Sequence, residues 1–138
     1  MDSMHLVRLG LGAGVIIWAA GTALLVPFGH WVFGPDNVLP VALSAGVIIA
    51  ATFAGVLLLA RRVLRGTGGA LIEKAALFGV LLCLPGLVFD GSLYALNSGR
   101  YPGLDATASG VMTAGLLLAY AAALLGALSA ARPLGPQS

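Results

Sequence analysis

The sequence predicts an all-α integral membrane protein, a bundle of four transmembrane helices. Of its 138 residues, 59% are hydrophobic and only 9% are charged, whereas soluble domains carry about 25% charged residues. The mean hydropathy is +1.03. Four apolar runs are each long enough for a membrane-spanning helix, which needs about 20 residues to cross a hydrocarbon core roughly 30 Å thick. These observations exclude an ordinary soluble globule.

The predicted helices are separated by short segments rich in residues that end helices. These segments read FGHWVFGPDN, RRVLRGTGG and NSGRYPGLD, with the Gly, Pro, Asn and Asp that are typical of turns. The four predicted helices span approximately residues 6–28, 38–60, 75–96 and 106–130. The first run exceeds the apolar core of about 7–15 residues found in signal peptides, so we expect a retained helix. Residues 1–138 are therefore predicted to form a single transmembrane domain.

Lysine and arginine positions predict how the chain is oriented, because cytoplasmic segments of membrane proteins collect these residues. Arg100 lies in a segment on one side of the membrane, and the other basic residues fall on the opposite side: Arg8, Arg61, Arg62, Arg65, Lys74 and Arg132. Both termini are therefore predicted to be cytoplasmic (N-in/C-in). In so apolar a chain these charges indicate topology, so the lipid bilayer is the expected partner and no nucleic acid is expected.

Small residues recur at a spacing of four in two of the predicted helices. The second helix contains Gly46 and Ala50, and the fourth contains Gly110 and Ala114. Small side chains let transmembrane helices approach closely. We predict that these residues pack helices together, either within the bundle or between chains of an oligomer.

One carboxylate, Asp90, interrupts the third apolar run. Tyr94 and Asn97 follow at helical spacing and share its face. An ionisable residue within a span usually faces the bundle interior or a wet cavity and marks a proton, ion or ligand site. We therefore predict an intramembrane site of Asp90, Tyr94 and Asn97, approached by His30 and Arg100 from the two loops on the outer side.

Pro85 and Gly86 precede Asp90 by about one turn and predict a kink. Proline removes a backbone donor and crowds the carbonyl four residues earlier. A fully open kink would let Asp90 cap a short outer helix that begins DGSL. A structural pairing of Asp90 with Arg100, His30 or Tyr94 is a further interpretation.

The sequence lacks the residues that are characteristic of several classes of metal, redox and catalytic site. Cys83 is the single cysteine, so the sequence has no CxxC redox pair and no cysteine-based zinc site. Its two histidines cannot form a transmembrane bis-histidine haem site, and GxSxG, HExxH and P-loop motifs are absent. We expect no metal and no cofactor, and an enzyme is the least favoured class.

Parts of the chain are similar to a known family. The pattern PGLVFDGSLYAL, the following RYPGL and a last helix ending LLLAYAAALL resemble a family of small bacterial four-helix membrane proteins catalogued as a domain of unknown function. The distinctive motif is P-G-x-x-x-D, here Pro85, Gly86 and Asp90, with Gly29 and Pro102 as weaker matches. The resemblance implies four helices in a bacterial cytoplasmic (inner) membrane and implies no activity.

The placement of Asp90 favours a small transport or ligand-binding bundle, in which this carboxylate is the ionisable group for a proton or a small molecule. The alternative is a non-catalytic accessory or assembly subunit of a membrane complex, in which Asp90 is a structural cap or pair. A second copy of the chain or another membrane protein would then be the partner.

Overall fold

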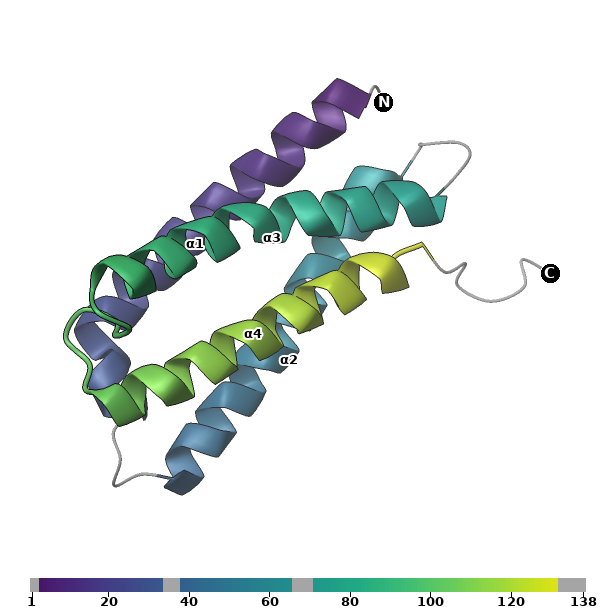
Figure 1. The fold of residues 1–138 in the computed structure, drawn as a ribbon. Helices are drawn as coiled ribbons and strands as arrows, with labels where there is room; N and C mark the ends of the chain where they lie inside the picture. The colour runs from purple at the N-terminus through teal and green to yellow at the C-terminus, as the bar shows by residue number, and fades with distance from the viewer. Residues whose placement is uncertain (1–2, 34–37, 66–70, 132–138) are drawn as a thin grey trace.

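A computed structural model describes residues 3–33, 38–65 and 71–131, without the side chains of residues 25, 29–33 and 38–40. The described residues form four helices and no strand (Figure 1). The helices are α1 (Ser3–Phe33), α2 (Val38–Leu64), α3 (Leu71–Leu96) and α4 (Ala106–Ser129). By length and composition, all four can cross a membrane. The predicted fold class, an all-α membrane protein of four helices, is confirmed.

Helices α1, α2 and α3 are longer than the sequence suggested. Helix α1 continues past Pro27 to Phe33, because neighbouring groups and local adjustments let transmembrane helices tolerate proline. His30 consequently lies within α1, not in a loop. Helix α2 continues through Arg61 and Arg62, whose positive charges favour a helix C-terminus. Helix α3 begins one turn earlier than predicted, at residue 71.

The helices lie in the spatial order α1, α3, α4, α2 (Figure 1). Helix α1 packs along α3, helix α2 packs along α4, and α3 packs against α4 to join the two pairs. Helices α1 and α2 follow each other in the chain but make few contacts with one another. The bundle is therefore closely packed on three sides and more open between α1 and α2.

A glycine marks each of the three close helix contacts. A Cβ atom at Gly14 of α1 would overlap the carbonyl oxygen of Leu82 in α3. A Cβ at Gly79 of α3 would lie 2.9 Å from the Cβ of Ala127 in α4, and one at Gly126 would lie 2.7 Å from the carbonyl oxygen of Phe53 in α2. Because lipid gives helices little hydrophobic reason to associate, close backbone approach of this kind is a main source of packing energy.

The small residues predicted to pack the helices do not do so within one chain. Gly46, Ala50, Gly110 and Ala114 all lie away from the buried core, and a Cβ at Gly46 or Gly110 would meet nothing within 4 Å. A spacing of four shows that residues share a helix face, but not that this face meets a neighbouring helix. A contact of these residues with a second chain stays a prediction.

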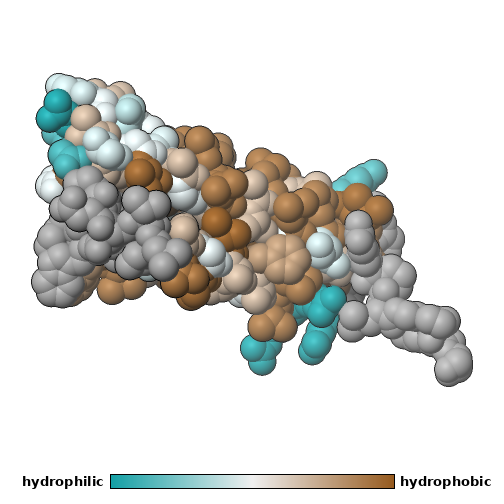
Figure 2. Space-filling model, turned by 90° about the horizontal axis from the view of Figure 1, so that it is seen from below, coloured by the Kyte–Doolittle hydropathy of each residue, from teal (hydrophilic) through white to brown (hydrophobic). Residues whose placement is uncertain are grey.

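Two clusters of buried side chains form the interior. The larger joins all four helices and includes Leu6, Val56, Phe78 and Ala127. The smaller consists of Tyr101, Ala108 and Met112, at the end of the bundle that carries the connection between α3 and α4. On the face that Figure 2 shows, hydrophobic residues cover the middle and hydrophilic residues gather toward the two ends. Such a band suits a bilayer.

The connection between α3 and α4 folds back over the end of the bundle. Its Tyr101 is buried, and the Tyr101 amide donates to Ser109 Oγ at 3.0 Å. Gly99 and Gly103 adopt positive φ angles of 74° and 79°, which glycine reaches without steric cost. Asp105 then caps α4 by accepting from the Ala108 amide at 2.7 Å.

Candidate functional site: an intramembrane cavity at Asp90

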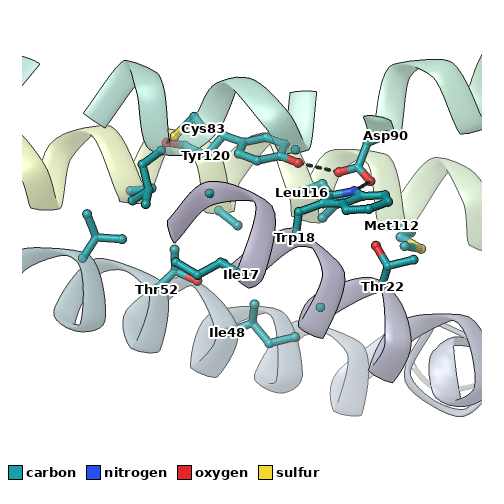
Figure 3. A pocket seen from close by; sticks show the side chains of 17 residues that line it. Ile17, Trp18, Thr22, Ile48, Thr52, Cys83, Asp90, Met112, Leu116 and Tyr120 are labelled. Carbon is teal, nitrogen blue, oxygen red and sulfur yellow. Dashed lines mark hydrogen bonds between the residues drawn. The ribbon is translucent and has the colours of Figure 1, made fainter. Parts of the chain in front are cut away.

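A cavity of about 180 Å³ lies between the four helices, and Asp90 forms part of its wall (Figure 3). Most of its lining is aliphatic, including Ile17, Ile48, Val56 and Leu116. The side chains that bring polar atoms to this lining are Trp18, Thr22, Thr52, Cys83, Asp90 and Tyr120. The site is thus an apolar space with one carboxylate.

Two aromatic side chains hold the Asp90 carboxylate. The Trp18 indole Nε1–H donates to Oδ1 at 2.9 Å, and the Tyr120 hydroxyl donates to Oδ2. Both interactions are visible in Figure 3. Because Trp18 belongs to α1 and Tyr120 to α4, Asp90 links three helices. A carboxylate buried in a low-dielectric interior needs such donors to offset its lost hydration.

Neighbouring residues on α3 accommodate the rings of Trp18 and Tyr120. The Trp18 ring packs against Phe89, with ring centroids 4.5 Å apart. A Cβ at Gly86 would overlap the Tyr120 hydroxyl, so the glycine one turn before Asp90 leaves room for the phenol. Tryptophan and tyrosine suit this position because each combines a large apolar surface with one polar group that needs a partner.

Pro85 and Gly86 do not interrupt the helix. Helix α3 is continuous from Leu71 to Leu96 with Pro85 inside it, so Asp90 is an interior helix residue and not the N-cap of a separate segment. The observed role of Gly86 is to admit Tyr120, and a kink at these two residues stays a prediction.

Among the predicted intramembrane-site residues whose side chains the structure describes, only Asp90 lines the cavity. Tyr94 instead packs against Tyr101, with ring centroids 5.8 Å apart. Asn97 donates to the backbone carbonyl of Arg100 at 3.0 Å, and both lie in the connection after α3. The side chain of His30 lies outside the described residues. Within the described part of the chain, the partners of Asp90 are Trp18 and Tyr120, with no ion pair to Arg100.

The tyrosine at the end of the bundle stays uncharged. Burial raises the pKa of Tyr101 to about 12, with a smaller contribution in the same direction from the negative charge of Asp90. Tyr101 therefore contributes a neutral ring that packs with Met112 over the cavity.

Sequence reasoning missed Trp18 and Tyr120 as site residues. Trp18 carried a usable signal, because tryptophan prefers the membrane interface and this one lies midway along α1. Tyr120 carried a similar one, because a hydroxyl well inside an apolar helix needs a hydrogen-bond partner. Neither signal identifies Asp90 as the acceptor, since the two residues lie 72 and 30 positions from it.

The Asp90 carboxylate retains unused hydrogen-bonding capacity toward the cavity. Two carboxylate oxygens offer about four acceptor positions, and the two described hydrogen bonds use one on each oxygen. The Cys83 thiol already donates to the Tyr120 backbone carbonyl at 3.8 Å. Among the described residues, no three His, Cys, Asp or Glu side chains gather as a metal site. The cavity can therefore present acceptors to a donor or cation of the right size.

Comparison of the chain with protein-family models, with curated proteins and with solved structures finds no match. The family resemblance of the PGLVFD stretch stays a prediction.

Proposed function

We propose that this protein is a small ligand-binding or transport bundle of a bacterial inner membrane, with both termini in the cytoplasm, and that its ligand is a small organic cation held at Asp90. The observation that carries the proposal is a carboxylate in the wall of an apolar cavity, with two neutral donors and no described basic partner.

The charge of the Asp90 carboxylate favours a cationic ligand. Trp18 and Tyr120 solvate the carboxylate but supply no positive charge. An ionised side chain within a span is expensive, by about 2.5–3.5 kcal/mol on insertion scales, and it usually faces a partner or a functional cavity. A protonated amine would neutralise Asp90 and occupy its free acceptor positions. The neighbouring aromatic rings add a further attraction for a cation.

The volume of the cavity favours a small ligand. The cavity volume is about 180 Å³, and an engineered cavity of roughly 150 Å³ in another protein binds benzene. The described cavity therefore suits a ligand portion of about one ring. Benzylamine is a suitable probe, because it joins such a ring to one ammonium group.

Benzylamine binding to the protein in lipid vesicles tests the proposal. Trp18 is the reporter in a Trp31→Phe background, with benzyl alcohol as the uncharged probe of similar size. We expect benzylamine to bind at least ~10-fold more tightly than benzyl alcohol, since a charge-assisted hydrogen bond contributes about 1.5–3 kcal/mol. Asp90→Asn should bring the two affinities close to each other.

The matched control is Glu73→Gln. Glu73 is an exposed carboxylate in the first turn of the same helix and does not line the cavity. This variant should retain the preference for benzylamine. A folded wild-type protein that binds neither probe, or an Asp90→Asn variant with the wild-type preference, would contradict the proposal.

A second candidate function is an assembly subunit, in which Asp90 serves only to link three helices. The observation that favours it is the position of Gly46 on α2, where a Cβ would meet nothing within 4 Å. A second chain could pack closely on such a face. Replacing the small residues of this face by larger ones and measuring the size of the assembly tests this function.

A further inference from the structure

Buried side chains flank the cavity at both ends of the bundle. On the side of the larger cluster, Leu82 and Cys83 belong both to that cluster and to the cavity wall. On the other side, Met112 lines the cavity and packs with the buried Tyr101. Tyr101 is only 6% exposed. The described packing therefore separates the cavity from both ends of the bundle.

The exposed part of the cavity wall lies on α1 and α2. Ile17 of α1 is 50% exposed and Ile48 of α2 is 39% exposed, whereas Leu82 of α3 and Met112 of α4 are each 5% exposed. Gly21 also belongs to the wall on α1, and a Cβ added there would meet nothing within 4 Å. The side on which α1 and α2 make few contacts is thus the side on which the cavity is open.

This opening lies at the depth of the hydrocarbon. Ile17 is next to the midpoint of α1 (Ser3–Phe33), and Ile48 lies ten residues into α2 (Val38–Leu64), or about 15 Å along it. The hydrocarbon core extends about 15 Å on each side of its centre. Both side chains around the opening are aliphatic, so acyl chains can contact them without loss of hydration.

We infer that the cavity is loaded sideways from the bilayer, through the opening between α1 and α2, and that its ligand class is the membrane-dissolved alkylamine. This inference rests on the proposed binding of a cation at Asp90. The ammonium group reaches the carboxylate, and the alkyl chain extends between Ile17 and Ile48 into the hydrocarbon. The site thereby selects amphiphiles that partition into the membrane over amines that stay in water.

Binding kinetics of n-octylamine test the route. The protein is reconstituted in phosphatidylcholine vesicles, in the Trp31→Phe background, and Trp18 fluorescence is followed after rapid mixing. Ile48→Phe narrows the opening, so association and dissociation should both slow by ~10-fold or more. Ile48→Ala should accelerate both rates.

Val47→Phe is the matched control, because Val47 is the adjacent residue, is 68% exposed and does not line the cavity. Its rates should equal those of the parent. If octylamine binding depends on Asp90 but Ile48→Phe leaves the rates unchanged, the sideways route is overturned and the cation site stands. A loss of affinity in Ile48→Phe with an unchanged association rate overturns the route as well. If the parent binds neither octylamine nor benzylamine, the cation site itself fails.

Discussion

Helices α2 and α3 are similar in length and both highly apolar, yet they lie in different environments. In its most apolar window, 39% of α3 is buried inside the protein, whereas only 6% of α2 is. Helix α3 contacts α1 and α4 through Gly14, Gly79 and Asp90. Helix α2 packs mainly on α4. Because lipid is as apolar as a leucine side chain, apolarity does not make a helix central. Close backbone contacts and polar links do.

Among substitutions that test the difference between α2 and α3, the largest loss of stability is expected from Gly14→Leu. A side chain at Gly14 would overlap the Leu82 carbonyl of α3, and helix backbones cannot yield as a flexible side chain can. Overpacking typically costs about 1–3 kcal/mol and occasionally more, and we expect the upper part of that range here. Thermal unfolding in detergent, followed by the loss of helical circular dichroism, measures it.

Gly46→Leu is the matched control on α2. A Cβ at Gly46 meets nothing within 4 Å, so the added side chain should leave the melting temperature of the single chain nearly unchanged. Equal destabilisation by Gly14→Leu and Gly46→Leu would show that the two helices do not differ in the way described.

A smaller effect is expected from removing the polar link of α3. Asp90→Ala leaves the Trp18 N–H and the Tyr120 hydroxyl without their acceptor. Interhelical hydrogen bonds in membranes contribute about 0.6 kcal/mol on average and up to roughly 1.7, so we expect a loss of about 1–3 kcal/mol for the two. Unfolding in a denaturing detergent series provides the free energies.

The same denaturing detergent series tests whether the hydrogen bonds to Asp90 are the source of this stability. Tyr120→Phe removes only the hydroxyl, so it should destabilise the parent but change the stability of Asp90→Ala little, because the acceptor is already absent. Full additivity of the substitutions would rule out the described hydrogen bonds as the source of the effect.

The smallest effect on the single chain, and the test of the assembly function, is expected from Gly46→Leu combined with Gly110→Leu. A Cβ at either position meets nothing within 4 Å, so the fold should remain intact. If the small-residue faces of α2 and α4 join chains, the larger side chains should reduce the oligomer size measured by light scattering after mild detergent extraction. An unchanged size would count against assembly through these faces.

Much of the fold could be predicted, but only part of the site. Asp90 was identifiable because a carboxylate in an apolar run is expensive. Tyr94 and Asn97 share its helical face, yet they lie four and seven residues further along α3, where the structure places Tyr101 and the connection to α4. Helical periodicity tells which residues align, but not how far along the helix a neighbouring helix provides a partner.

The sequence by itself determined that this is a four-helix membrane protein with a carboxylate, Asp90, inside its third apolar run, because long apolar runs can satisfy their backbone in lipid only as helices. The tertiary structure decided that Asp90 meets Trp18 and Tyr120, that Gly14 and not Gly46 brings helices together, and that the cavity opens between α1 and α2. The physical reason is that all four helices are apolar over most of their surface. Their order in the bundle therefore depends on a few close contacts and hydrogen bonds between residues far apart in the chain.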